Sequence, residues 1–259
     1  MKTELIKAEN YDAENVERPA GSRWVTMSNA LARAGQGLTL SEKRIVMMAV
    51  SKLDSFRPQN PSDVPVTRIT AAEYVEAYQV DVNTAYDQLQ AAAKVLYNRS
   101  ITFYEAAHKR KGKALVPTVV KMRWVGEAKY QKNEGWIELA WWPKLLPYLI
   151  NLRKQFTKYQ LQQASALRSI YSWRLLEILT RFQSTGVADY TIEDFCQAMD
   201  APEKHLLNFA KVREKIIEPA VKELTQKDGW IIQWEAIKAG RKVAKLRFRF
   251  ARNPQQSLF

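Results

Sequence analysis

The sequence predicts an α+β protein made of two similar domains in tandem, each with a three-helix core followed by a β-hairpin. Three observations lead to this fold class. The chain has 259 residues, which is enough for two domains that each bury a core. Apolar residues recur at helical spacing behind capping residues, and farther along they alternate as in strands. This order of helical and strand-like stretches occurs twice.

The first half is predicted to form three helices and then strands. Thr70 and Glu73 have the spacing of a capping box at the start of the second helix, and Asn83 is expected to open the third. The stretches SITFYEA, VPTVVKMRWV and WIELAW are rich in β-branched and aromatic residues, and the basic segment HKRKGK (108–113) joins the first two as a hairpin tip. The helices are expected over residues 39–53, 69–80 and 83–96.

The second half repeats this order, with helices expected over residues 165–183, 190–199 and 206–224. The strands GWIIQWEAI and KVAKLRFRF follow, joined by the basic turn KAGRK. Three short helices and a hairpin form the winged-helix plan, in which the third helix enters the DNA major groove and the hairpin contacts the backbone. The predicted parts of the chain are a flexible N-terminal tail (1–22), two winged-helix domains (23–142 and 143–253) and a C-terminal tail (254–259).

The charge balance indicates a polyanionic partner. The chain has 40 Lys and Arg against 27 Asp and Glu, a net charge of +13, and this favours nucleic acid. A membrane is not expected, because no uncharged apolar run approaches the roughly 20 residues that span a bilayer. The first residues also lack the apolar centre of a signal peptide, so a cytoplasmic protein is predicted. The single cysteine, Cys196, is expected in the core.

The third helix of the second domain carries the main candidate DNA-binding residues. On a helical wheel, Phe209, Val212, Ile216, Ala220 and Leu224 share one side, which is the expected core face. An Asn among lysines on the other side could contact adenine beside phosphates, although a solvated helix face is the ordinary alternative. His205 at the helix start is either such a contact or a plain polar residue. The cations and amide of this opposite face are Lys204, Asn208, Lys211, Lys215 and Lys222.

The second hairpin strengthens the DNA interpretation, because residues 238–252 hold seven Lys or Arg and no acid. Strand alternation places Leu246, Phe248 and Phe250 on an apolar face, and the opposite face is expected to be basic and free. The members of that face are Lys245, Arg247 and Arg249. The residues of this hairpin expected to contact DNA are Lys238, Arg241, Lys242 and Lys245.

The first domain offers a weaker version of the same surface. Its third helix is nearly neutral, so it is expected to position the protein on the DNA backbone more than to read bases. The candidate residues are Asn83, Thr84 and Gln88 on the helix, and Lys109, Arg110, Lys111 and Lys113 on the hairpin tip.

The sequence does not predict an enzyme, a cofactor or a metal site. The two histidines, His108 and His205, lie in unrelated contexts and form neither a metal motif nor part of a catalytic triad. No GxxxxGK[ST] loop is present. A tyrosine recombinase is the nearest enzymatic alternative, but neither histidine begins its expected His-x-x-Arg motif.

Several stretches resemble the iteron-binding replication initiators of bacterial plasmids, the family of the F-plasmid initiator. They are TLSEKRIVMMAV, YLINLRKQFTKYQL, SIYSWRLLEILTRF, VREKIIEPAVKEL and LRFRF, and they span residues 38–250 in the family's order. The resemblance implies two winged-helix domains that bind direct repeats (iterons) at a plasmid origin, help to open the duplex and recruit host proteins. It also implies dimers, formed through the first domain, that bind an inverted repeat and repress the protein's own gene.

The resemblance assigns base reading to Lys211, Arg213 and Lys215 of the second domain. Glu214 departs from the family, where a basic residue is frequent, so a different DNA sequence is expected to be read. The wheel places Arg213 nearer the buried side, with its head reaching a phosphate. A winged-helix transcriptional repressor that binds one inverted repeat is the alternative function.

The tail QQSLF (255–259) resembles the short peptide by which bacterial proteins dock on the sliding clamp. In this interpretation the Gln255 amide bonds at the pocket rim, and Leu258 and Phe259 fill an apolar groove. A frayed tail, or one folded onto its own domain, is the alternative. The expected partners are therefore double-stranded DNA, the host replication initiator and helicase, the sliding clamp and a second copy of the chain.

Overall fold

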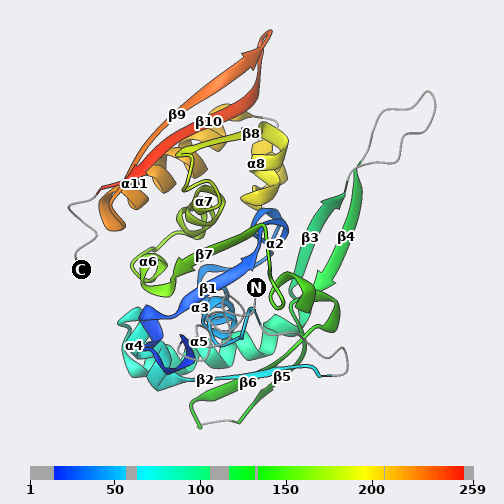
Figure 1. Cartoon of the computed structure of the whole chain (residues 1–259), viewed down its shortest axis with the longest axis vertical. Coiled ribbons are helices and arrows are strands. Elements are labelled where there is room, and N and C mark those ends of the chain that lie inside the picture. Colours follow the sequence, from blue (N-terminus) through cyan, green and yellow to red (C-terminus); the bar gives the residue numbers. More distant parts are fainter. Residues whose placement is uncertain (1–14, 57–62, 106–116, 132–133, 207, 254–259) are drawn as a thin grey trace, which may run out of the picture.

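The computed structural model describes residues 15–56, 63–105, 117–131, 134–206 and 208–253. Helices and small antiparallel sheets alternate along the chain, and the two β-hairpins extend in similar directions from the body (Figure 1). The elements of the first half are η1 (Ala20–Ser22), β1 (Trp24–Ser28), α2 (Asn29–Arg33), α3 (Leu40–Val50), β2 (Val66–Thr70), α4 (Ala71–Tyr78), α5 (Val82–Val95), η2 (Leu96–Asn98), β3 (Ser100–Glu105), β4 (Thr118–Arg123), β5 (Val125–Tyr130) and β6 (Trp136–Trp141).

The second half begins with a short 3₁₀ helix and ends in the long hairpin β9–β10, which pairs with β8 in the order β8-β10-β9. Its elements are η3 (Pro143–Tyr148), β7 (Phe156–Gln160), α6 (Leu161–Ser165), α7 (Ile170–Thr180), β8 (Val187–Thr191), α8 (Ile192–Ala198), α9 (Glu203–Leu206), α10 (Phe209–Val212), η4 (Arg213–Ile217), α11 (Glu218–Lys227), β9 (Trp230–Ala239) and β10 (Lys242–Arg252).

Local capping signals place most helices where the sequence predicts them. The Thr70 side chain accepts from Glu73 N while Glu73 accepts from Thr70 N, so the predicted capping box is confirmed. The expectation that Asn83 opens the next helix is wrong. Asp81 caps α5 instead, because its carboxylate accepts from Thr84 N at 2.9 Å and the helix begins one residue before Asn83.

The third helix of the second half differs from the single segment predicted over 206–224. A separate turn, α9, precedes it, and Asn208 then caps α10. The chain continues with helical backbone angles from α10 through η4, a π-helical turn, into α11. Pro219 lies at the start of α11 and has no N–H to donate, which interrupts the regular ladder of α-helical hydrogen bonds at the π turn.

The two-stranded sheet β1–β7 crosses the domain boundary that was predicted after Trp142. Trp24 pairs with Gln160 and Ser28 with Phe156, so a strand assigned to the second domain completes a sheet of the first. Sequence patterning missed both strands because each is five residues long and its partner is more than 100 residues away.

Helix α7 is the central element between the two halves (Figure 1). It lies in the core, with Trp173, Leu175, Leu176, Ile178 and Leu179 fully buried. Arg174 on the same helix donates to the carbonyls of Ala32 at 2.9 Å and Ala34 at 2.7 Å in the first half, and to Ala198 O at 2.7 Å in the second. One guanidinium therefore joins backbone segments of both halves.

A buried ionic cluster surrounds this arginine. Glu177 lies 2.6 Å from both Lys43 Nζ and Arg174 Nη1, and all three side chains are at most 1% exposed. Tyr159 OH also donates to Glu177 Oε1 at 2.8 Å. Desolvation lowers the pKa of Lys43 from 10.5 to about 8, against the opposing attraction of Glu177. The carboxylate therefore balances two buried cations, one from each half of the chain.

Candidate nucleic-acid interface

The helix formed by α10, η4 and α11 buries the predicted core face. Val212, Ile216, Ala220 and Leu224 are at most 1% exposed, and Phe209 is half-buried against Trp234. Ile217 is buried as well, although the uniform wheel did not select it. The wider π turn brings two successive residues, 216 and 217, to the core. The opposite side of this helix is left in contact with solvent.

The predicted base-reading residues lie on that exposed side, and each is paired with an acid of the same helix. Lys211 Nζ is 3.2 Å and Lys215 Nζ is 2.8 Å from Glu214, and these two hydrogen bonds lower the pKa of the exposed Glu214 carboxyl, Lys215 contributing most. Arg213 pairs with Glu218 at 3.3 Å. Ion pairs at the surface contribute little to stability, so these cations can exchange their acidic partners for other anions.

The expectation that Arg213 lies nearer the buried side is wrong, because its side chain is 55% exposed. Its partner Glu218 is five residues later, a spacing that the π turn brings into register along the helix. The wheel assumed the α-helical period throughout and could not include this shift.

The start of the helix contributes three further candidates. Lys204 and Asn208 are exposed, and His205 is half-buried with its Nδ1 unpaired among the described residues. Asn208 Oδ1 accepts from Ala210 N at 3.0 Å as the helix cap. This leaves the amide nitrogen of Asn208 as its free donor and removes the bidentate adenine contact in this conformation.

The hairpin β9–β10 carries a second group of cations. Lys238, Arg241, Lys242 and Lys245 are all exposed, and the turn between the strands uses Gly240 at φ +62°. The predicted apolar face is confirmed, with Leu246 and Phe248 fully buried and Phe250 7% exposed.

The prediction that the basic face of this hairpin is free is wrong for two of its residues. Arg247 makes two bonds of 2.8 Å to the Asp189 carboxylate on β8, and Arg249 bonds Glu235 on β9 at 2.9 Å. The hydrogen bond from Arg247 lowers the pKa of Asp189. Acids on both neighbouring strands therefore neutralise the middle of β10. The cations of this hairpin that form no ion pair with another described residue lie toward its tip.

Of the DNA-contact residues predicted in the first domain, two have side chains that are already bonded within the protein. Thr84 Oγ1 bonds the Asp81 carboxylate and Gln88 Oε1 accepts from Tyr74 OH at 2.5 Å, so both side chains serve the fold. Asn83 is exposed. Lys109, Arg110, Lys111 and Lys113 lie outside the described residues, as do Gln255, Leu258 and Phe259. Strands β3 and β4 pair antiparallel, which confirms the strand pairing predicted on either side of the basic segment.

The described residues show neither a metal-binding cluster nor a membrane-spanning helix. Within these ranges, no group of three or more His, Cys, Asp or Glu could hold a metal ion. None of the helices seen there is long and apolar enough to cross a membrane. Cys196 is buried at 3% exposure, and burial raises the pKa of its thiol to about 11.

Comparisons with known proteins agree with the winged-helix plan. A family model described as "Initiator Replication protein, WH1" matches residues 24–180, and one described as "Initiator Rep protein, WH2" matches residues 191–250. The first match ends well past the boundary predicted after Trp142. An uncharacterized 27.6 kDa protein of Escherichia coli is 25% identical over 224 residues, which cover 84% of this chain and 91% of that protein.

The crystal structure of the Pi initiator protein in complex with iteron DNA has a similar fold. Its TM-score is 0.73 at 19% identity, covering 90% of this chain and 99% of that chain. Together, the two family matches and the shared fold confirm the predicted pair of winged-helix domains. The chain belongs to the family of initiator replication proteins.

Proposed function

We propose that this chain initiates plasmid replication by binding directly repeated origin sites, the iterons, as double-stranded DNA. The observation that carries the proposal is the row of exposed cations on the third helix of the second winged-helix domain, beside a hairpin whose tip is also cationic. Family membership and the iteron complex of the similar Pi initiator support the same ligand.

In this proposal the second domain reads the sequence. Lys211, Arg213 and Lys215 enter the major groove, and their present partners Glu214 and Glu218 are exchanged for base edges and phosphates. Lys204, His205 and Asn208 contact the DNA at the helix start. The hairpin residues Lys238, Arg241, Lys242 and Lys245 hold the backbone, as the wing does in related folds.

In the first domain, the exposed Asn83 and the basic segment that contains Lys109, Arg110, Lys111 and Lys113 position the protein on the DNA backbone. The side chains of Thr84 and Gln88, which were also predicted as contacts, are held by Asp81 and Tyr74. Further steps rest on the family resemblance alone. They are origin opening, recruitment of the host initiator and helicase, and repression of the protein's own gene by a dimer formed through the first domain. The protein acts in the cytoplasm by binding and recruitment, without a catalytic step, a cofactor or a membrane.

The test is fluorescence anisotropy on a duplex that carries the direct repeats near the gene, against a scrambled duplex, at two salt concentrations. A preference of about 1000-fold or more for the repeats is expected of specific recognition. Equal and steeply salt-dependent binding to both duplexes would contradict the proposal. A third duplex with an inverted repeat tests the alternative, because a simple repressor should prefer it to the direct repeats.

The tail 255–259 is proposed to dock on the bacterial sliding clamp. Removing these five residues should abolish capture of purified clamp and leave the affinity for the repeated DNA unchanged, because Leu258 and Phe259 supply the apolar anchors. Surface plasmon resonance with immobilised clamp measures the effect. A Gln256→Ala variant is the control, since this residue is not one of the proposed contacts. Equal clamp binding by the full chain and the shortened chain would exclude the tail as the docking peptide.

A further inference from the structure

We propose that Asp200 determines which spacing the protein accepts between the two DNA contacts of a repeat. Its carboxylate joins the turn before the recognition helix of the second domain to the base of the hairpin β3–β4 in the first. Asp200 is a positioning residue in this role and does not touch DNA. Since both domains must contact the same repeat, the role rests on the proposed function.

The Asp200 side chain binds two successive backbone N–H groups of the first domain. Its Oδ2 accepts from Gln36 N at 2.7 Å and from Gly37 N at 3.1 Å. Successive N–H groups that converge on one oxygen are suited to an anion, and a charged acceptor strengthens each hydrogen bond. Gln36 is buried and Asp200 is exposed, so this contact lies at the edge of the junction between the domains.

Residues 35–37 are bonded to the base of the first hairpin. Gly35 and Thr102 of β3 exchange two backbone hydrogen bonds, of 2.9 and 2.7 Å. Gln36 O accepts from the indole Nε1 of Trp124, which directly follows β4, at 2.9 Å. The segment is therefore held from both strands of the hairpin, and a group that binds this segment also orients the hairpin.

The other end of the contact is the turn between α8 and the recognition helix formed by α10, η4 and α11. Asp200 has a left-handed backbone, with φ +49°, just past the end of α8, where glycine is the most frequent residue. A side chain in this conformation costs conformational energy. The two hydrogen bonds to the first domain offset that cost and give the aspartate a function that glycine could not supply.

Two attachments along one segment fix a rotation that a single attachment would leave free. Arg174 on α7 donates to Ala32 O and Ala34 O at the buried end of the segment. Asp200 binds residues 36 and 37 nearer to solvent. With Arg174 alone, the second domain could turn about the buried guanidinium. The second attachment therefore sets the direction of the recognition helix relative to the first hairpin.

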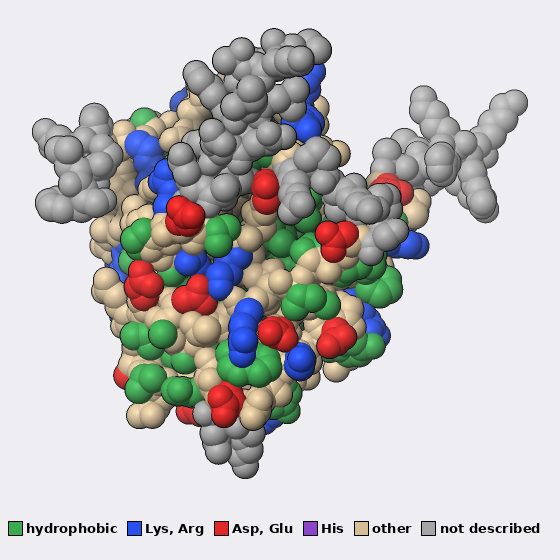
Figure 2. All heavy atoms as spheres, turned by 60° about the horizontal axis from the view of Figure 1, so that its bottom comes forward, with side chains coloured by type: hydrophobic (Ala, Val, Ile, Leu, Met, Phe, Trp, Pro, Cys, Tyr) green, Lys and Arg blue, Asp and Glu red, His purple; other side chains and the backbone are tan. Residues whose placement is uncertain are grey.

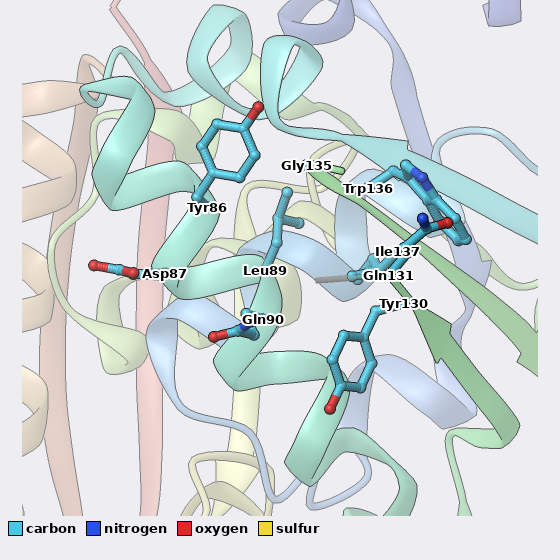
Figure 3. A pocket seen from close by; sticks show the side chains of 9 residues that line it. All are labelled: Tyr86, Asp87, Leu89, Gln90, Tyr130, Gln131, Gly135, Trp136 and Ile137. Carbon is cyan, nitrogen blue, oxygen red and sulfur yellow. The ribbon is translucent and has the colours of Figure 1, made fainter. Parts of the chain in front are cut away.

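The hairpin is the main DNA contact of the first domain, because the surface around α5 is poorly suited to phosphates. A pocket of about 340 Å³ between α5 and the strands β5 and β6 is lined by aromatic, apolar and amide side chains, with Asp87 as the charged residue of its lining (Figure 3). Figure 2, which brings the bottom of Figure 1 forward, shows acids among the Lys and Arg side chains and no continuous basic field. The relevant spacing is thus from the first hairpin to the second recognition helix.

The test replaces Asp200 by glycine, which removes the carboxylate and suits the left-handed backbone. Asp200→Asn is the conservative variant, because its amide oxygen can still accept from both N–H groups. The matched control is Gln79→Gly, the same kind of change at an exposed residue with φ +50° that ends α4 within the first domain. Because both positions are exposed, all three variants should unfold near the urea midpoint of the wild type.

Anisotropy is measured on the native repeat and on repeats lengthened by two base pairs at successive positions. An insertion between the two contacts moves one of them by about 7 Å and turns it by about 70° around the duplex. The wild type should bind the most affected duplex about 30-fold more weakly than the native repeat, whereas Asp200→Gly should lose less than about 5-fold. Asp200→Asn should lie between these values, and Gln79→Gly should match the wild type. Equal losses for the wild type and Asp200→Gly, or no loss in the wild type, would overturn the proposal.

A second variant opens the contact from the first domain. A Cβ on Gly35 would lie 2.7 Å from Asp200 Oδ1 but 3.6 Å from the Thr102 side chain, so Gly35→Ala should also reduce the effect of the insertion. In the Asp200→Gly background this substitution should add nothing, because the carboxylate that it displaces is absent. Additive effects of the two substitutions would contradict a role through their mutual contact.

Distances between spin labels test the role of Asp200 without DNA and so separate it from the proposed function. Labels are attached at Lys121→Cys on β4 and Gln226→Cys on α11, both exposed, in a Cys196→Ala background. The wild type should give one narrow distribution of distances, and Asp200→Gly one about twice as broad. An unchanged distribution in Asp200→Gly would overturn the proposal. Equal binding of repeated and scrambled DNA by the wild type would instead contradict the proposed function.

Discussion

Replacing Glu177 by glutamine is expected to lower the free energy of unfolding by about 3–5 kcal/mol. The glutamine keeps the size of the side chain but removes the negative charge that balances Lys43 and Arg174, each 2.6 Å away. Both cations would then be buried without the carboxylate that pairs with each of them. Urea unfolding at pH 7, followed by tryptophan fluorescence and by circular dichroism, measures the loss.

The matched control is Glu235→Gln, which makes the same change in an ion pair whose side chains are about half exposed. This variant should lose about 1 kcal/mol at most, because solvent screens the pair with Arg249. Similar stability of the two variants would mean that the buried cluster does not hold uncompensated charge when Glu177 is neutral.

The cluster also explains how the two halves are held in a fixed arrangement. Arg174 reaches carbonyls on both sides of the junction, and Asp200, just after α8, accepts from the backbone N–H groups of Gln36 at 2.7 Å and Gly37 at 3.1 Å. These bonds are directional, so they specify one relative orientation where apolar contacts alone would allow several. A fixed orientation sets the distance between the two wings.

Sequence patterning predicted the elements that depend on neighbouring residues. The helix of residues 40–50 begins at a capping box of Thr39 and Glu42, and the hairpin β9–β10 alternates apolar and basic residues as expected. Patterning missed the sheet β1–β7 and the cluster of Lys43 and Glu177. In both cases the two interacting segments are more than 100 residues apart in the sequence. Nothing near Lys43 or Glu177 in the sequence indicates that these charged side chains are buried.

The same distinction between features that depend on neighbouring residues and features that depend on distant ones applies to the candidate DNA interface. The exposed side of the helix from α10 to α11 follows from its apolar period, and the position of Glu214 within helical reach of Lys211 and beside Lys215 is visible in the sequence. The pairing of Arg247 with Asp189 is not, because it joins strands 58 residues apart. The hydrophobic periodicity did not predict the π turn, because it assumes one helical pitch along the whole helix.

Replacing Lys211, Arg213 and Lys215 together by glutamine is expected to weaken binding to the repeated DNA by about 100-fold or more. The variant removes three cations and leaves Glu214 and Glu218 without partners at the same surface, so two uncompensated acids would face the phosphates. If each cation contacts one phosphate, the slope of log affinity against log salt should fall by about 2–3 units. Anisotropy titrations over a salt series give both quantities.

The control for this triple variant is Lys94→Gln, which removes an exposed cation from the last turn of α5 in the first domain. It should change the affinity less than 2–3-fold, because this residue is outside the proposed contacts. The triple variant should also unfold at nearly the same urea concentration as the wild type, since all three side chains are about half exposed. An unchanged affinity and salt slope in a folded triple variant would remove this helix from the DNA interface and leave the hairpin as the main contact.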